Sequence, residues 1–499
     1  MATKTVTKAD KARVVERREQ HHEADVVVVG AGVFGCAIAY ALANQGRSVI
    51  LLERWMHEPD RIVGELLQPG GCETLRKLGM GDCLEGIDAA PCYGYHVIYR
   101  GEEVSFPYPP VDKHGNIIWN ADVTKFTSRP EGRGFHHGRF IMNLRRKCLN
   151  HENISVFETE VTATIKDTHS KAVLGVQTQT KDPKTGKKKP DCFFGSLTII
   201  ADGYASIFRK ELLGTEPVVR SKFYGLELID CQLPSQGYGH VVIGDGALAL
   251  LYQIGTHETR ALIDVPLDAA KPETGGVRGY IERVVLPALP PQVQPAVRKA
   301  MADGKIPKSM PNSWLPSCKQ TRNDGVILLG DAHNMRHPLT GGGMTVAFND
   351  AYLLSQLLHP ERVPDLADYN AVHSAMSTFH WKRKSLTSII NVLAQALYSL
   401  FAADDWQLRA LQKGCFRYFQ LGMTEAPVSL LGGLLQRPLT LAYHFFSVAF
   451  LAIWLNMIDC CSGKGVLGVF MLPVALVQAV MIWWKACVVF LPVFATELK

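Results

Sequence analysis

The sequence predicts a mixed α/β (α+β) fold in three parts: a Rossmann-type dinucleotide-binding domain, a second domain built on an antiparallel sheet, and a C-terminal helical region associated with a membrane. Three observations predict these parts. A glycine motif follows a short apolar strand near residue 30, short alternating runs fill the middle of the chain, and the composition becomes strongly apolar from Pro438 onward. With 499 residues, the chain is long enough for two or three domains with full-sized cores.

The dinucleotide motif lies near the N-terminus, where Gly30, Gly32 and Gly35 have the G-x-G-x-x-G spacing directly after a β-branched strand at 25–29. Gly30 permits the turn, Gly32 lets the backbone approach a pyrophosphate, and Gly35 lets helix and strand pack closely. A helix is expected at 33–44 and a second strand at 48–52. That strand ends at Glu53, which is placed for the hydroxyls of an adenosine ribose. Strand, glycine loop, helix and terminal Glu together indicate dinucleotide binding.

Two later segments repeat the pattern of strand, acidic residue, glycine and helix. A strand at 326–329 is followed by Asp331 and by three glycines ending at Gly343, which leave backbone N–H groups open at the start of a helix through Leu358. Asp202 follows a strand in the middle of the chain. Each has a simpler alternative, because Gly-Asp occurs in many loops and Asp is a common helix N-cap.

Residues 55–92 are expected to be helical and to carry Arg61 and Gln68 back toward the cofactor. Beyond them, alternating runs suggest the strands of an antiparallel second domain. The expected strands are 95–99, 102–106, 156–164, 172–180, 192–200, 223–228, 240–243, 248–254 and 260–265. Residues 181–191, rich in Lys, Pro and Gly, are expected to be a hairpin tip between two of them.

Composition excludes several classes of protein. The formal charge of +6 is mild, and its basic runs carry no interleaved aromatic residues, so no nucleic acid partner is expected. Twelve cysteines without a C-x-x-C pair form neither a disulfide nor a zinc framework, which favours a reducing, cytosol-facing setting. His136 and His137 are adjacent and have no third ligand at useful spacing, so no metal is expected.

The two ends of the chain differ. Residues 1–22 are polar and lack an apolar h-region, so we expect a disordered segment that is not a targeting signal. The tail has apolar runs at 445–458, 466–484 and 486–495. At ~1.5 Å per residue the first two would be about 21 and 28 Å long, against a hydrocarbon core of ~30 Å. Breaks at 459–464, Pro473, Lys485 and Pro492 favour short helices dipping into one leaflet. One true span at 466–484 is the alternative.

These patterns divide the chain into five regions. The expected regions are a disordered segment at 1–22, a discontinuous cofactor domain at 23–92, 130–215 and 320–360, a substrate-binding sheet domain at 93–129 and 216–319, a helical region at 361–437, and hydrophobic membrane-associated helices at 438–499.

The order of these motifs resembles the FAD monooxygenases of the hydroxybenzoate-hydroxylase type. The segments EPDRIVGELLQPGG, GRGFHHGRFIMNLRR and LLGDAHNMRHPLTGGGMTVAFND are similar to the squalene monooxygenase (squalene epoxidase) family, and the similarity runs from about Asp25 to the apolar tail. Two departures are visible. Animal members carry a long N-terminal extension with a hydrophobic segment, so membrane attachment here is expected to rest on the tail. Leu66 and His333 stand where Phe and Tyr are commoner in animal members.

The resemblance implies a set of site residues around FAD. Together with Gly30, Gly32, Gly35 and Gly343 of the motifs, it implies an FAD site formed by Val33, Phe34, Glu53, Arg54, Arg61, Leu66, Arg145, Val161, Asp331 and Met344, with Asp202 in support. It implies a substrate pocket walled by Tyr252, Pro338, Leu339, Phe401, Phe416, Phe419, Pro427, Leu430 and His444. Any one of the phenylalanines could equally be core of a helical domain.

Tyr95 and Gln68 are the expected catalytic residues, where flavin and substrate pocket meet. Our hypothesis is that Tyr95 positions Gln68 or the flavin edge without donating a proton. The segment His337-Pro338-Leu339 is expected to form the floor between flavin and pocket.

The activity implied by the resemblance is epoxidation of squalene to (S)-2,3-oxidosqualene in sterol biosynthesis. The expected partners are O2, a reductase of the NADPH-cytochrome P450 reductase type and membrane lipid, at the cytosolic face of the endoplasmic reticulum (microsomal) membrane. A separate reductase is expected because only one credible dinucleotide motif exists and FAD uses it. Two rivals stay open: a flavoenzyme that saturates prenyl chains, such as a geranylgeranyl reductase, and a non-redox prenyl-binding protein of the same fold.

Overall fold

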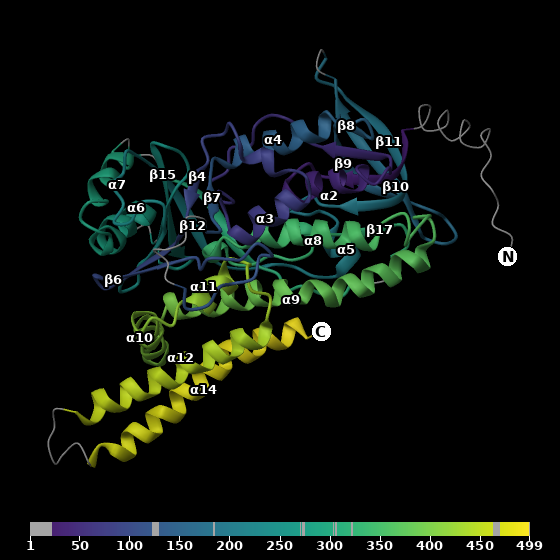
Figure 1. Ribbon diagram of the computed structural model, residues 1–499. Coiled ribbons are helices and arrows are strands. Elements are labelled where there is room, and N and C mark those ends of the chain that lie inside the picture. The colour runs from purple at the N-terminus through teal and green to yellow at the C-terminus, as the bar shows by residue number, and fades with distance from the viewer. Residues whose placement is uncertain are drawn as a thin grey trace, which may run out of the picture.

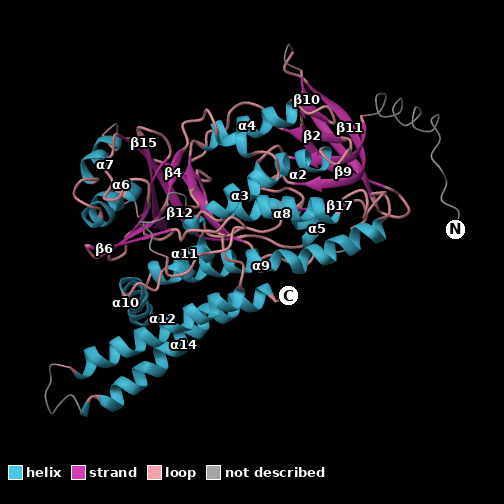
Figure 2. Cartoon of the chain, in the orientation of Figure 1, coloured by secondary structure: helices cyan, strands magenta, loops and turns pink. Residues whose placement is uncertain are grey.

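The structure is a computed structural model that describes residues 22–498 except 122–128, 183–184, 270, 272–274, 303, 305–306, 321–322 and 463–469. The segment expected to be disordered, 1–22, lies outside the described residues apart from its last position. Figure 2 shows the strands gathered at two ends of the body, with helices between them. The ribbon in Figure 1 shows the long helix α9 (Tyr369–Phe401) running beneath both groups.

The first sheet is built on the predicted dinucleotide fold. Its parallel part contains β8 (Ile154–Glu158), β2 (Val49–Glu53), β1 (Glu23–Val29), β11 (Lys188–Ile200) and β17 (Val326–Leu328). Alternate side chains of β1 face different layers: Val26 and Val28 pack with α2 (Val33–Ala43), whereas Val27 and Val29 pack on the opposite face. The predicted strand 25–29, helix 33–44 and strand 48–52 are therefore confirmed within one or two residues.

The strands between 156 and 200, whose alternating pattern suggested the second domain, belong instead to this first sheet, within the region 130–215 expected for the cofactor domain. Strands β9 (Glu160–Lys166) and β10 (Val173–Lys181) extend β11 in antiparallel fashion, and β10 and β11 are the two strands joined by the predicted hairpin tip. The predicted single strand 156–164 is two strands, and its first half, β8, pairs with β2. An alternating pattern shows that one sheet face is buried but does not identify the sheet.

The second sheet has the order β16 (Lys308–Trp314), β12 (Val218–Ile229), β15 (Glu258–Pro266), β14 (Leu248–Gln253), β13 (Gly239–Ile243), β5 (Gly94–Tyr99) and β6 (Glu102–Pro107). It is antiparallel except where β13 pairs with β5. Ala249 and Leu251 pack under α6 (Gly276–Tyr280) and α7 (Gln294–Ala300), while Leu250 and Tyr252 face the C-terminal helices. Strand β16 was not predicted.

Residues 55–92 are mostly not helical, so that prediction is wrong. They form loops, the short strands β3 (Leu66–Leu67) and β4 (Ala90–Cys92), one helix, α3 (Pro69–Lys77), and a 3-10 turn at Gly81–Leu84. Strands β3 and β4 flank β7 (Gly132–Gly134) in a small antiparallel sheet. Glycines and prolines punctuate this stretch and stop a helix from continuing beyond nine residues.

The C-terminal region contains α10 (Trp406–Gln420), α11 (Glu425–Leu431), α12 (Pro438–Cys461) and α14 (Leu472–Glu497). Figure 1 shows α12 and α14 side by side, projecting away from the body. Both are long and apolar enough to cross a membrane, by length and composition only. The prediction of short helices broken at Lys485 and Pro492 is wrong, since α14 runs through both positions. The charge of Lys485 is paired with Asp405, Nζ to Oδ2 2.5 Å, so it does not interrupt the helix.

Candidate functional site: a cavity between two sheets

One cavity lies where the carboxyl ends of three parallel strands meet the second sheet. It is lined by Gly32 after β1, Gly203 after β11 and Asp331 after β17, and on the other side by residues of β13, β14, β15 and β16. In open α/β sheets, ligands bind in the crevice outside the carboxyl ends of the strands. The three chain-distant motifs of the sequence therefore close around one space, as expected.

The glycines of the first loop have different surroundings. Gly30 has φ +101°, and an added Cβ would collide with the carbonyl oxygen of Ala201; one on Gly35 would collide with the carbonyl oxygen of Gly30. A Cβ on Gly32 would meet nothing within 4 Å. Gly30 and Gly35 are thus needed for backbone contact inside the fold, whereas Gly32 keeps the cavity wall open to a pyrophosphate.

Glu53 is held in place by Arg145, which lies on α4 (His137–Leu149). Its Oε2 accepts a hydrogen bond of 2.8 Å from the N–H of Ala31 and lies 3.3 Å from Nη2 of Arg145. The buried Arg145 also donates from Nε to the carbonyl of Ala31, at 2.9 Å. Arg145 therefore fixes the glycine loop and the carboxylate together, and Glu53 keeps lone pairs free for a ribose.

The loops that carry Asp202 and Asp331 are joined by Arg209, a residue that the sequence reasoning did not single out. The Nε of Arg209 donates to the carbonyl of Ala332 at 2.8 Å, and its Nη2 donates to the carbonyls of Asp331 at 3.1 Å and Gly203 at 3.2 Å. One oxygen of Asp202 accepts a hydrogen bond of 3.1 Å from the N–H of Ile207, ahead of the short helix α5 (Arg209–Leu213). Because the N-cap of α5 is Phe208, Asp202 does not have the helix N-cap role held open as an alternative. Its other oxygen is buried without a protein partner in the described structure, and burial raises the pKa of this carboxyl.

The helix α8 (Gly343–Leu357) begins at the cavity. Gly343 and Met344 line the space, and a Cβ on Gly343 would meet nothing within 4 Å. Gly342 precedes the helix and offers no side-chain cap, so the first N–H groups of α8 are open to a negatively charged ligand. The predicted helix from Met344 to Leu358 is confirmed within one residue at each end.

Gln68 lies behind the cavity in a fully buried position. Its Oε1 accepts a hydrogen bond of 2.6 Å from the hydroxyl of Tyr108, and its Nε2 donates to the carbonyl of Thr340 at 2.9 Å. Tyr95 lines the cavity, and its buried hydroxyl has no hydrogen-bond partner among the described residues. Burial raises the pKa of both tyrosines, so each is a neutral phenol. Tyr108 was missed because a tyrosine in a Pro-rich loop carries no motif.

The segment expected to form the floor does reach the cavity. Pro338 and Leu339 line it, together with Met335, Arg336 and Thr340. His337 points away: its ring stacks on Tyr398 at 4.0 Å between centroids, and burial lowers its pKa to about 3. His337 is therefore neutral and supports the floor from behind.

The segment before β3 is fixed by Glu65 and Arg260, two residues that the sequence reasoning also missed. Glu65 lines the cavity and accepts two hydrogen bonds from Arg260 of β15, 2.7 Å from Nε and 2.9 Å from Nη2. Both side chains are buried. A bidentate pair of this kind holds the 61–66 segment against the second sheet.

The predicted cofactor residues fall into three groups by position. Those lining the cavity are Gly32, Val33, Phe34, Arg61, Leu66, Asp331, Gly343 and Met344. Gly30, Gly35, Glu53, Arg145 and Asp202 lie directly behind its wall. Arg54 and Val161 do not line it: Arg54 stacks on Trp55 at 3.8 Å, and Val161 packs beside the core of the first sheet.

The predicted substrate residues divide in the same way. Tyr252, Pro338 and Leu339 line the cavity. Phe401, Phe416, Phe419 and Leu430 belong to the hydrophobic cluster that also contains Tyr95, Tyr252 and Leu339, but they do not line the cavity. The ring of Phe416 instead packs against Tyr99, with 5.1 Å between ring centroids, and the ring of Phe419 packs against Phe106, with 5.0 Å between centroids. Pro427 is half-buried on α11. The Nδ1 of His444 lies 2.8 Å from the hydroxyl oxygen of Tyr418. Their substrate role stays a prediction.

No group of His, Cys, Asp or Glu that could hold a metal ion occurs among the described residues. His137, one of the two adjacent histidines considered for a metal, has its Nδ1 2.8 Å from the carbonyl oxygen of Gly64, and burial lowers its pKa to about 3.

FAD fits the residues present. Bare backbone at Gly32 and Gly343 leaves room for the diphosphate, Glu53 is placed beside the first loop, and the N-terminus of α8 favours negative charge. A Rossmann-type domain that opens in this way onto an antiparallel substrate sheet defines the class of FAD-dependent monooxygenases, and the chain is a flavoprotein enzyme of that class.

The comparisons with known proteins identify the family. Residues 194–470 match the squalene epoxidase family model, and residues 25–57 match the model of FAD dependent oxidoreductases. The chain is 64% identical to squalene epoxidase ERG1 of Gibberella zeae over 96% of this chain and 97% of that protein. It is 39% identical to squalene monooxygenase of Mus musculus over 95% of this chain and 78% of that protein. The chain belongs to the squalene epoxidase family.

Solved structures share the fold. A probable FAD-dependent monooxygenase from Pseudomonas aeruginosa, PqsL, superposes with a TM-score of 0.60 at 22% identity, over 76% of this chain and 97% of that one. HpxO of Klebsiella pneumoniae, solved in complex with FAD, has a TM-score of 0.59 at 21% identity, over 83% of this chain and 99% of that one.

Proposed function

We propose that this enzyme epoxidises squalene to (S)-2,3-oxidosqualene in sterol biosynthesis, using O2 and electrons from an NADPH-dependent reductase. One observation carries the proposal: a single cavity has a polar end and an apolar end. The polar end is formed by Gly32, Asp331 and Gly343, and the apolar end is formed by Leu250, Tyr252 and Leu262.

Bound FAD supplies the redox chemistry, activating O2 and transferring one oxygen atom to an electron-rich alkene. The chain must exclude water from the reacting atoms and hold a hydrocarbon end beside the flavin. The apolar end of the cavity suits both tasks, because squalene has no polar group to orient it. Leu339 and Pro338 lie on the floor between the two ends. Tyr95 supplies one neutral hydroxyl at this boundary, which supports a positioning role.

Product analysis tests the reaction. The purified chain with FAD, squalene, a P450-reductase-type donor, NADPH and 18O2 should give 2,3-oxidosqualene that carries one 18O atom. A prenyl-saturating enzyme would form product under anaerobic conditions and incorporate no label, and that result would overturn the proposal. A boiled-enzyme sample controls for autoxidation of squalene.

The electron donor is tested separately. The dinucleotide motif formed by β1 and α2 opens onto the cavity assigned to FAD, so electrons from NADPH should arrive through another protein. Stopped-flow mixing of the purified chain with NADPH alone should leave the flavin absorption unchanged over many turnover times. Rapid bleaching would contradict a separate reductase. Adding the reductase should bleach the flavin.

The membrane attachment proposed for this enzyme is at the cytosolic face of the endoplasmic reticulum. Its support is the apolar exposed surface of α12 and α14, where Phe450, Trp454, Val480 and Trp484 are each at least 60% exposed. Contiguous apolar surface of this kind marks a membrane or protein contact. Co-flotation with phospholipid vesicles tests the contact, and microscopy of the tagged chain in cells tests the compartment.

A further inference from the structure

The end of α14 carries a buried carboxylate. Glu497 is 2% exposed, although most of α14 is apolar and much of its surface is open. Its Oε2 lies 3.3 Å from Nζ of Lys384, and its Oε1 accepts a hydrogen bond of 2.8 Å from Nδ2 of Asn391. Burying a carboxylate is costly unless it is paired and hydrogen-bonded, so its partners decide where this helix end can sit.

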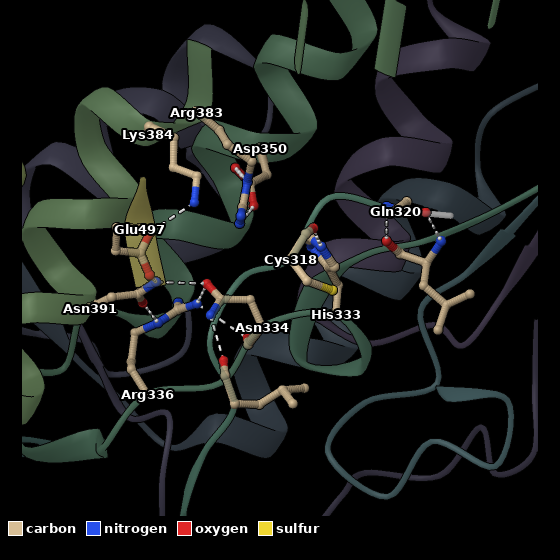
Figure 3. Close-up of polar contacts among 12 residues, drawn as sticks. Cys318, Gln320, His333, Asn334, Arg336, Asp350, Arg383, Lys384, Asn391 and Glu497 are labelled. Carbon is tan, nitrogen blue, oxygen red and sulfur yellow. Dashed lines mark hydrogen bonds and ion pairs between the residues drawn. The ribbon is translucent and has the colours of Figure 1, made fainter. Parts of the chain in front are cut away.

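The contact continues from Asn391 to the cavity. Oδ1 of Asn391 accepts a hydrogen bond of 2.9 Å from Nε of Arg336, and Nη2 of Arg336 donates to the carbonyl of Asn334 at 3.2 Å. Asn334 in turn donates from Nδ2 to the carbonyl of Leu315 at 2.7 Å. Figure 3 shows Glu497, Asn391, Arg336 and Asn334 in one continuous chain of contacts. Arg336 lines the cavity, next to the floor residues Pro338 and Leu339.

Two buried cations lie beside this chain of contacts. Arg336 and Lys384 are buried cations, and burial lowers the pKa of Arg336 to about 10 and lowers that of Lys384. The nearby carboxylate of Asp350 is engaged by Arg383 in a two-point contact, with Nε to Oδ1 3.0 Å. Glu497 is the carboxylate in direct contact with Lys384 and is one residue removed from Arg336.

A helix end that needed only anchoring could rely on apolar contacts. α14 already has such contacts, since Ala486 and Phe490 are buried in the hydrophobic cluster. The carboxylate adds a polar connection, at a desolvation cost, that ends on the segment between cofactor and substrate.

We propose that Glu497 is a positioning residue: through Asn391 it holds Arg336 and the cavity floor at 335–339, so that the lipid-facing hairpin of α12 and α14 and the reaction cavity form one unit. The proposal rests on the proposed function for its catalytic consequence but not for its structural one. A displaced floor would admit water to the flavin and loosen the hydrocarbon end.

The test compares two variants of the full chain loaded with FAD. Glu497→Gln keeps an acceptor for Asn391 but removes the charge. Asn391→Leu leaves the contact of Glu497 with Lys384 and cuts the connection to Arg336. Both should shift the flavin absorption band in the absence of substrate, and both should lower the ratio of epoxide formed to NADPH consumed, by roughly tenfold.

Asp459→Asn is the matched control. The carboxylate of Asp459, on α12, is also paired with a lysine: its Oδ2 lies 2.5 Å from Nζ of Lys413 on α10. Both side chains are at least half exposed, and neither belongs to the chain of contacts from Glu497 to Asn334. It should leave spectrum and coupling as in the wild type.

A wild-type flavin spectrum and wild-type coupling in Asn391→Leu would overturn the proposal, and so would the same result in Glu497→Gln. If Glu497→Gln fails to fold, Asn391→Leu decides alone. The flavin spectrum is recorded without squalene, so it tests the role of Glu497 independently of the reaction. If the enzyme were inactive on squalene, the proposed function would be refuted, but the spectrum would still test the role of Glu497.

Discussion

The hydroxyl of Tyr108 donates a 2.6 Å hydrogen bond to Oε1 of Gln68, and both side chains are completely buried. Because Nε2 of Gln68 donates to the carbonyl of Thr340, the amide has one orientation and ties the start of α3 to the cavity floor. A residue from the Pro-rich loop after β6 thus fixes one of the two predicted catalytic residues.

Tyr108→Phe should therefore weaken both stability and activity. It leaves the buried Oε1 of Gln68 without its donor, which costs about 1–3 kcal/mol in the free energy of unfolding. The looser floor should also lower epoxide formation per NADPH. Thermal unfolding and product assays check the two effects. Tyr93→Phe is the control because Tyr93 is 41% exposed, and equal behaviour of the two variants would contradict the role of this contact.

Tyr95→Phe should lower coupling of NADPH use to epoxidation without shifting the pH profile between pH 6 and pH 9. Burial raises the pKa of Tyr95, so its phenol does not titrate in that range and serves only as a positioned hydroxyl. Epoxide yield and hydrogen peroxide release are measured together across pH. Full epoxidation with normal coupling would show that the hydroxyl has no role.

Two glycines of the same motif should respond in different ways. Gly32 has φ −87° and open space at its Cβ position, so Gly32→Val should fold with a free energy of unfolding changed by less than about 0.5 kcal/mol in the FAD-free protein. It should lose the flavin absorption, because the new side chain occupies the space of the diphosphate.

Gly35→Ala is the contrasting change. Its Cβ would overlap the carbonyl oxygen of Gly30, so the FAD-free protein itself should lose roughly 1–3 kcal/mol. Thermal unfolding of both variants without FAD separates the two roles. Equal destabilisation by the two substitutions would mean that Gly32 is needed for folding as well.

Asp264→Asn should remove part of the pH dependence of stability. The buried Asp264 accepts hydrogen bonds from Ser221 at 2.5 Å and Asn312 at 2.8 Å, yet burial raises its pKa from 3.8 to about 6. Between about pH 4 and pH 6 the folded chain keeps a proton that the unfolded chain has lost. Unfolding then releases a proton, so the free energy of unfolding falls as pH rises through this window, by up to about 3 kcal/mol.

The measurement is the wild-type minus Asp264→Asn difference in the free energy of unfolding, followed from pH 4 to pH 8. It should decrease up to about pH 6 and then stay constant. The nearby His337, whose pKa is lowered to about 3, contributes the opposite slope in both proteins and largely cancels. A pH-independent difference would contradict the raised pKa of Asp264.

The dinucleotide elements could be predicted from sequence because their signals are local. The strand before Gly30, the helix after it and the strand ending at Glu53 are each specified by residues within a few positions. The helix starting at Gly343 followed from the glycines that precede it. The apolar tail was equally visible, although the continuity of α14 through Pro492 was not.

The sequence by itself thus determined the fold class, the family and the three motifs that surround one cavity, because each depends on short-range patterns of glycine, charge and apolar residues. Only the tertiary structure decided which residues hold those motifs in place. Three contacts are examples: Arg209 joins two loops, Tyr108 fixes Gln68, and Glu497 is connected to Arg336 through Asn391. The hydrogen bonds from Arg209 to Ala332, from Tyr108 to Gln68, from Asn391 to Glu497 and from Arg336 to Asn391 each join residues 40 or more positions apart in the sequence. A buried polar group needs a hydrogen-bond partner, and that partner can come from any segment that folding brings close. A local sequence pattern therefore does not identify it.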